Sequence, residues 1–242
     1  MNIDYVNIDR SFDDMPLDEP FICSFSGGKD SAIALSEACQ RGKVKGLLHW
    51  VNKEHNKSTF HMQKLSLIEA QAKCMDIPIF TTYNIPWSQH LGVTNMYKNF
   101  VKQGIKSIVF GDIFVEDSAK LQYILCKQAE LIPRYPIWKQ DSSKLMQAML
   151  DYKIKCIITR VNTCLLDKKW LGRFYDEEVY NSFCKMRIDP FGENGEFHTT
   201  VIDAAIFKKP LNYHLNMNDS TADSVHISVS SHNHPITTNR LI

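Results

Sequence analysis

Apolar and polar positions along this chain form blocks that predict strands and helices in turn. Short apolar runs with the length and flanking breaks of buried strands occur at 21–25, 44–50, 77–83 and 107–110. Helix-like segments follow them at 32–38, 61–76, 88–103 and 118–131. The alternation predicts an α/β fold, a Rossmann-like doubly wound parallel sheet with helices on both faces and ligands at the carboxyl ends of the strands.

The second half of the chain departs from this alternation. Two prolines in 132–136 break the pattern and predict an interdomain linker. Beyond it, helices are predicted at 142–151 and 176–186, and strands at 155–161 and 201–207, which indicates a smaller α+β domain. The predicted organisation is therefore a loose N-terminal segment (1–19), a first domain (20–132), a second domain (136–215) and a polar tail (216–242). The tail is interpreted as either mobile or a marginal hairpin.

A short turn rich in glycine and serine connects the first predicted strand to the first predicted helix. A strand, a turn and a helix start in this order present backbone N–H groups at a helix N-terminus, where the donors and the dipole both favour a phosphate. The glycines let the backbone approach an oxyanion, the serines add hydroxyl donors, and the lysine adds a positive charge. The spacing matches neither Walker A nor the dinucleotide fingerprint. The predicted phosphate site consists of Ser26, Gly27, Gly28, Lys29, Asp30 and Ser31.

Composition and charge narrow the class of protein. The 242 residues, of which 44% are hydrophobic, suffice for one large or two small domains. A net charge of +1 argues against a broad nucleic-acid surface. The 7 cysteines include no Cys-x-x-Cys pair, so neither a disulfide framework nor a zinc site is indicated. No apolar run is long enough for a bilayer, and the first residues are Asp-rich where a signal peptide would be basic, so we expect a cytoplasmic protein without a membrane partner.

A second segment, Gly-Glu-Asn-Gly-Glu-Phe-His-Thr at 192–199, places two acids and a histidine among glycines. The turn at 26–31 resembles the PP-loop of the ATP pyrophosphatases. Taken together with Phe60-His61, Gly111-Asp112 and Pro136-Ile137-Trp138, the two motifs resemble the diphthine–ammonia ligase family over residues from about 21 to 212.

This resemblance implies a PP-loop domain that binds ATP and a smaller substrate-binding domain that carries the segment at 192–199. It implies ATP-dependent amidation of the diphthine carboxylate on elongation factor 2, with ammonium as the nitrogen donor and AMP plus pyrophosphate as products. His61, Gly111 and Asp112 would join the turn at 26–31 in binding the nucleotide. The loop at 114–120, where the family usually has a Ser-Asp-Tyr-Gln-Arg-like run, is expected to face the acceptor.

A carboxylate must be activated before ammonia can displace one of its oxygens, and the implied reaction assigns roles accordingly. Lys29 would hold the leaving pyrophosphate and Mg²⁺ would bridge the phosphates, with Asp30 and Asp112 as its candidate ligands. The acids Glu193 and Glu196, three residues apart, are expected to converge on ammonium and to accept its proton. The predicted catalytic set is Lys29, Asp30, Glu193, Glu196 and His198.

Each position also has a structural interpretation that the sequence leaves open. Asp30 suits a helix cap, and Asp112 suits a turn. The two glutamates suit a solvated surface. His198 fits a substrate contact, an acid or base, or a packed strand residue, and His61 fits a nucleotide contact, a helix cap or an exposed position.

Other functions share this fold. The acceptor can be a carboxylate other than diphthine. A tRNA-modifying PP-loop enzyme is disfavoured by the missing Cys-x-x-Cys and the near-neutral charge, so no nucleic-acid partner is expected. A nucleotide sensor without activity is disfavoured because both motifs are intact. Whether the chain forms a homo-oligomer is left open.

Overall fold

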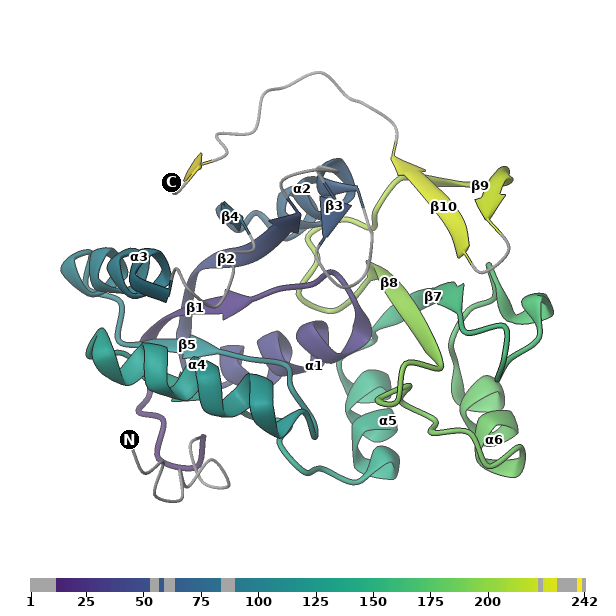
Figure 1. The fold of residues 1–242 in the computed structure, drawn as a ribbon, viewed down its shortest axis with the longest axis horizontal. Helices are drawn as coiled ribbons and strands as arrows, with labels where there is room; N and C mark the ends of the chain where they lie inside the picture. The colour runs from purple at the N-terminus through teal and green to yellow at the C-terminus, as the bar shows by residue number, and fades with distance from the viewer. Residues whose placement is uncertain are drawn as a thin grey trace.

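A computed structural model describes residues 12–52, 57–58, 64–83, 90–221, 224–229 and 239–240. Two sheets organise them, one in each half of the molecule (Figure 1). Within the described residues, no helix has both the length and the apolar character needed to cross a bilayer.

The first sheet has the order β11-β4-β2-β1-β5-β6, with β3 paired to β2. Its parallel strands are β1 (Pro20–Ser24), β2 (Lys43–Asn52), β4 (Ile79–Tyr83), β5 (Ser107–Val109) and β6 (Ile132–Arg134), and β11 (Asn239–Arg240) extends it in parallel at β4. The short β3 (Lys57–Ser58) is antiparallel. The chain winds outward from β1 to one edge and then to the other, which places a topological switch point between β1 and β5 and confirms the doubly wound α/β fold.

Helices cover both faces of this sheet. One apolar cluster joins residues of α1 (Lys29–Cys39) and α2 (Leu65–Met75) to Phe21 and Cys23 of β1. A second cluster joins residues of α3 (His90–Lys102) and α4 (Glu116–Gln128) to Ile22 of the same strand. Successive side chains of a strand point to opposite faces, so a strand buried on both faces is apolar throughout. This is the physical reason for the uninterrupted apolar run of β1.

The second sheet is antiparallel, with the order β8-β7-β10-β9. Its strands are β7 (Lys155–Val161), β8 (Phe197–Asp203), β9 (Tyr213–Thr221) and β10 (Ser224–Val229). The helices of this half are α5 (Ser142–Asp151), the 3-10 helix η2 (Lys168–Trp170) and α6 (Glu177–Lys185), which begins at a cap where Asp176 accepts a hydrogen bond from Val179 N at 3.0 Å. The α1/α2 cluster continues through α5 into this half, so the two halves share one core.

The predicted linker at 132–136 is wrong. Residues 132–134 form β6, paired in parallel with β5, and both Arg134 and Tyr135 are buried. Proline is compatible with this strand because β6 lies at the edge of the sheet, where a missing N–H does least harm.

Two further boundaries differ from the prediction. The strand expected at 201–207 begins at Phe197, so the last three residues of the 192–199 motif lie on β8. Of the two interpretations of the polar tail, the structure has the hairpin, since β9 and β10 pair and β10 also joins β7. The domain boundaries otherwise stay predictions.

Residues 12–19 contain no helix or strand, as expected, but they are not loose. Met15 lies in the core, and buried Glu19 pairs with Arg134 of β6 at 2.9 Å. This segment is therefore fixed to the far edge of the first sheet.

Candidate functional site

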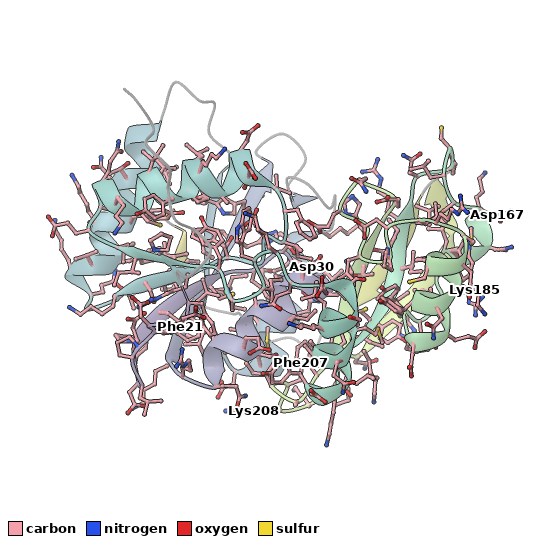
Figure 2. All side chains as sticks on the ribbon, turned by 90° about the horizontal axis from the view of Figure 1, so that it is seen from below. Phe21, Asp30, Asp167, Lys185, Phe207 and Lys208 are labelled. Carbon is pink, nitrogen blue, oxygen red and sulfur yellow. The ribbon has the colours of Figure 1, made fainter. Side chains whose placement is uncertain are left out.

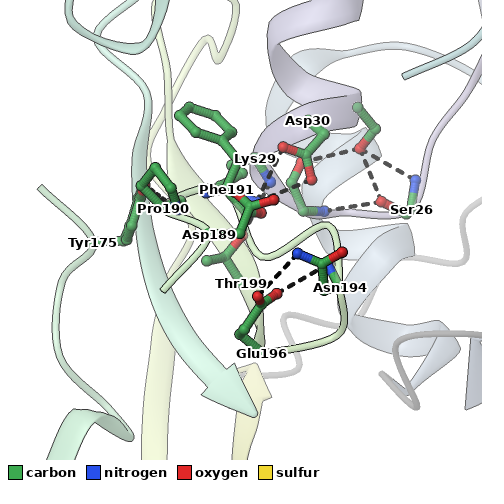
Figure 3. Close-up of polar contacts among 12 residues, drawn as sticks. Ser26, Lys29, Asp30, Tyr175, Asp189, Pro190, Phe191, Asn194, Glu196 and Thr199 are labelled. Carbon is green, nitrogen blue, oxygen red and sulfur yellow. Dashed lines mark hydrogen bonds and ion pairs between the residues drawn. The ribbon is translucent and has the colours of Figure 1, made fainter. Parts of the chain in front are cut away.

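The turn at 26–31 leaves the carboxyl end of β1 and enters α1 (Figure 3). Gly27 has a φ of +87°, and a β-carbon added there would lie 2.5 Å from Ile68 Cδ1. Ser26 and Ser31 lie on either side, with their hydroxyl oxygens 3.1 Å apart, and Ser26 Oγ accepts a hydrogen bond from Gly28 N at 3.3 Å. The turn is thus a tight cradle in which a side chain at Gly27 has no room, as a phosphate-binding loop requires.

The turn is bonded to the second sheet. Gly27 O accepts hydrogen bonds from Val201 N at 2.9 Å and from Gln71 Nε2 at 3.0 Å, and the same Nε2 reaches Val201 O at 2.6 Å. Lys29 N donates to Thr199 Oγ1 at 3.1 Å. The turn at 26–31 therefore lies where the two halves meet, and Figure 2 shows Asp30 in that central position.

The side chain of Lys29 is buried and extends into the second half. Its Nζ donates to Phe191 O at 2.5 Å and lies 5.0 Å and 5.1 Å from the ring centroids of Phe191 and Phe197. It also lies 3.1 Å from Asp30 Oδ2. The charge of the turn is consequently fixed in place by carbonyl, carboxylate and aromatic groups.

Carboxylates from three segments gather beside this lysine. Burial raises the pKa of Asp30, although the adjacent Lys29 opposes this. Burial, and then the Asp30 charge, raise the pKa of Glu193 to about 7, with Asp189 and Asp112 adding to the effect. Burial raises the pKa of Asp112 to about 6, opposed by a hydrogen bond from Ser118 and assisted by Asp30. The predicted residues Asp30, Asp112 and Glu193 are thus brought into one electrostatic group.

The fit to Mg²⁺ can be judged from these acids. Among the described residues, no three histidine, cysteine or acidic side chains are arranged to hold a metal ion by themselves. Magnesium usually takes only one or two carboxylates and completes its shell with phosphates and water. Asp30 meets part of that need: its Oδ1 is buried and accepts no hydrogen bond in the part of the chain described, but it is ion-paired with Lys29 Nζ at 3.1 Å.

Glu196 has a different environment from Glu193. It is buried, and its carboxylate accepts hydrogen bonds from Asn194 N at 2.9 Å and from Asn194 Nδ2 at 3.2 Å (Figure 3). These bonds shape the Gly192–Gly195 loop, in which both glycines have positive φ. The expected convergence of the two glutamates on one cation stays a prediction.

His198 lies on β8 directly opposite Arg160 of β7. Burial, and then the charges of Lys29 and Arg160, lower its pKa to about 4, so the ring is neutral near pH 7. A cavity of about 330 Å³ opens beside it, lined by Arg160, Val161, Asn162, Thr163, Gly195, Phe197 and His198.

The structural interpretations of the acids can now be compared with their surroundings. The cap of α1 is Gly28, without a side-chain bond, and Asp30 lies in the first turn, so Asp30 is not the helix cap. Gly111 and Asp112 follow β5, and a β-carbon at Gly111 would lie 2.9 Å from Ser31 Cα, which shows how closely this segment meets the turn. His61, predicted to contact the nucleotide, lies outside the described residues.

Sequence reasoning missed several residues at the site. Gln71 is fully buried and links both halves, yet it appears in the sequence as one polar residue of an amphipathic helix. Phe191 acts through its carbonyl and ring, for which no sequence signal exists. Arg160 could have been noticed, because it is a lone charge near the end of the buried strand Lys155–Val161.

Comparison with known proteins matches both halves of the chain. The diphthamide synthase N-terminal domain model matches residues 21–132, and the diphthamide synthase C-terminal domain model matches residues 141–226. The diphthine–ammonia ligase of Schizosaccharomyces pombe is 24% identical over 208 residues, which cover 76% of this chain and 34% of that protein. The diphthine–ammonia ligase of Bos taurus is 30% identical over 114 residues, which cover 46% of this chain and 43% of that protein.

The chain therefore spans less than half the length of these relatives. A solved structure titled as a predicted subunit of tRNA methyltransferase from Methanocaldococcus jannaschii covers 80% of this chain and 100% of its own, with 13% identity and a TM-score of 0.42, a similarity too low to carry an argument. Because the two domain models match in order along one chain, over 21–132 and 141–226, the protein belongs to the diphthamide synthase family, the family of the diphthine–ammonia ligases.

Proposed function

We propose that this protein is an ATP-dependent ligase that converts a carboxylate into an amide with ammonium, and that its acceptor is diphthine on elongation factor 2. One observation carries the proposal: Lys29 of the turn at 26–31 donates to Phe191 O of the second half at 2.5 Å, two residues before Glu193, whose pKa the charge of Asp30 helps to raise. A site for the phosphates of ATP and an acid suited to ammonium then lie together. Membership of the diphthamide synthase family supports the same reaction.

The reaction has two steps. An acceptor carboxylate oxygen attacks the α-phosphorus of ATP, forming a C–O–P linkage while the bond to the bridging oxygen of the β-phosphate breaks and pyrophosphate leaves. Ammonia then attacks the acyl carbon, the bond from that carbon to the AMP oxygen breaks, and the nitrogen loses a proton. The products are an amide, AMP and pyrophosphate.

The residues of this chain hold charge and move protons. The turn at 26–31 would bind the phosphates, with Lys29 held near them by Phe191 O and Asp30. Positive and dipolar groups that are already in place stabilise the charge of a leaving group without having to reorganise. This electrostatic stabilisation is usually the largest contribution to the rate of such reactions. Bound Mg²⁺, held by Asp30 and Asp112, would neutralise charge on the phosphates.

We assign Glu193 as the base that accepts the proton of the attacking nitrogen. Its pKa of about 7 lies near the pH of the cell, where a carboxylate can accept a proton from the attacking nitrogen and release it again. Glu196 shapes the loop that presents Glu193, through its bonds to Asn194.

The test is incubation of the protein with ATP, ammonium and diphthine-bearing elongation factor 2, followed by mass spectrometry of the modified peptide. Conversion of carboxylate to amide with equal release of AMP and pyrophosphate is expected. ATP cleavage that requires ammonium but another carboxylate would identify a different acceptor, and cleavage that requires RNA would overturn the proposal.

A further inference from the structure

The cavity beside His198 is built entirely from the second half of the molecule. Two short segments, 160–163 and 195–198, line its volume of about 330 Å³. Its polar side chains are those of Arg160, Asn162, Thr163 and His198. The reaction steps above use none of Arg160, Asn162 and Thr163.

A break in strand pairing places Arg160 at this cavity. The register pairs Ile158 with Thr199 but Arg160 with His198, so Thr159 is an extra residue in β7. A bulge of this kind bends a strand and redirects the next side chain, and bulges are common beside functional sites. Directly opposed residues of an antiparallel pair lie on one face of the sheet, so Arg160 and His198 share a face.

One residue, Phe197, borders both the cavity and Lys29 of the turn at 26–31. Phe197 lines the cavity, and the ring of the same Phe197 lies 5.1 Å from Lys29 Nζ. The charges of Lys29 and Arg160 both act on His198, so the two cations lie within electrostatic range of the same ring. A group held at Arg160 therefore lies on the side of the cavity that senses the charge of the turn.

We infer that this cavity, with Arg160 as its cationic end, binds the carboxylate group of the acceptor and presents it to the phosphate-binding turn. A guanidinium donates two parallel hydrogen bonds to a planar carboxylate, and neutral His198, Asn162 and Thr163 add uncharged partners. The acids Glu193 and Asp30 on the turn side would repel an anion, so a cation is needed for a carboxylate to approach. The inference rests on the proposed function, since it names where that reaction takes its acceptor.

A phosphate of the nucleotide has the same anionic oxygen chemistry, and the experiment separates the two sources. The variant Arg160→Gln removes the guanidinium, and Arg160→Lys keeps the charge without the two-pronged geometry. The control Lys155→Gln removes a positive charge from the same strand, at a side chain that is 63% exposed and outside the cavity. Each protein is assayed for amide formation on diphthine-bearing elongation factor 2 and, separately, for binding of a non-hydrolysable ATP analogue.

Arg160→Gln is expected to raise KM for the acceptor by about 10- to 100-fold, the effect of losing hydrogen bonds to a charged group, with the analogue Kd changed less than twofold. Arg160→Lys should fall between wild type and Arg160→Gln, and Lys155→Gln should match wild type. An unchanged analogue Kd also shows that the variant is folded. An unchanged acceptor KM, or a matching rise in the analogue Kd, would overturn the inference while leaving the proposed function intact. Absence of amide formation by the wild-type protein would overturn both.

Discussion

The carboxyl groups beside the turn at 26–31 have raised pKa values, so their protonation changes near neutral pH. Burial is the first cause for Glu193 and for Asp112, and the charge of Asp30 adds to both. Their pKa values of about 7 and about 6 mean that the site changes charge close to neutral pH. A bound cation would relieve the same repulsion, so protons and cations compete for these oxygens.

The raised pKa of Glu193 predicts a specific dependence of stability on pH. Between its ordinary pKa of 4.5 and its folded pKa of about 7, the native state keeps a proton that the unfolded chain has released, so the free energy of unfolding falls as pH rises through this window. Glu193→Gln removes the penalty, and the variant should be more stable than wild type at pH 8 by about 1 to 3 kcal/mol, with little difference at pH 5. Urea unfolding at both pH values, without nucleotide or metal, measures it.

The matched control for this prediction is Glu177→Gln, the same substitution at an exposed position in the first turn of α6. Its effect should be small and the same at pH 5 and pH 8. A Glu193→Gln protein whose stability tracks wild type across the range would show that Glu193 is an ordinary surface acid.

The conformation of the turn depends most on the backbone of Gly27. Its φ of +87° is strained for any other residue, and a β-carbon there would meet Ile68 and Gln71. Gly27→Ala should therefore lower the free energy of unfolding by about 2 to 4 kcal/mol, the sum of backbone strain and overpacking. Chemical denaturation followed by circular dichroism gives the value.

Gly104→Ala separates those two contributions. Gly104 has nearly the same φ, +85°, but nothing lies within 4 Å of its added β-carbon, so only strain remains and about 1 kcal/mol is expected. Equal losses of unfolding free energy in Gly27→Ala and Gly104→Ala would mean that the contact with α2 does not restrict Gly27.

At the scale of elements, the segment before β1 and the edge strand β6 are held together by buried charge. Arg134 donates two hydrogen bonds to Glu19, from Nε at 3.1 Å and from Nη2 at 2.9 Å, and a further one to Asp14. Both Arg134 and Glu19 are buried. Such a pair contributes little compared with apolar packing, yet removing Glu19 leaves a buried charge that Asp14, whose side chain is 83% exposed, compensates only in part.

Glu19→Gln should accordingly lower the free energy of unfolding by about 3 to 5 kcal/mol, because the Arg134 guanidinium loses its bidentate partner inside the protein. Asp18→Asn is the comparison, since Asp18 pairs with Lys43 at 3.2 Å with both side chains more than half exposed, and it should cost less than about 1 kcal/mol. Thermal unfolding of both variants measures the difference. Equal losses of stability in Glu19→Gln and Asp18→Asn would contradict this account.

At the scale of the whole molecule, the two halves are joined through the turn at 26–31 and a shared core. The buried amide of Gln71 bonds Gly27 O and Val201 O at once, so it connects α2, the turn and β8. The position of the turn at 26–31 is thereby linked to the position of β8 in the second half.

Gln71→Leu removes this connection and should lower the free energy of unfolding by about 1 to 3 kcal/mol, because Val201 O loses a buried donor. Hydrogen exchange should accelerate in β8 and in the turn but not in β5, which lies away from the lost bonds. Gln147→Leu, the same substitution on α5 at an exposed residue bonded to Asp151, should leave exchange in β8 unchanged. Uniform acceleration throughout the Gln71→Leu protein would point to general destabilisation instead.

The sequence by itself determined the doubly wound fold and the glycine turn that joins β1 to α1. Both follow from local physics: strands buried on two faces must be apolar, and a glycine turn before a helix must present amide groups. The same local logic failed at 132–136, because two prolines look like a linker until β5 is seen to supply a partner for an edge strand. The convergence of Glu193 and Glu196 on one cation stays a prediction, because spacing carries no information on which way a loop turns its side chains.

Only the tertiary structure decided how the two motifs meet. Lys29 Nζ donates to a carbonyl and contacts two aromatic rings that lie more than a hundred residues away in the chain. The pKa of Glu193 is raised first by its burial and then by the charge of Asp30. Burial and electrostatic interaction depend on distance in space, and the core shared by the two halves fixes that distance. Part of the candidate site could therefore be named from the sequence, whereas the protonation of its residues and their partners depend on the fold.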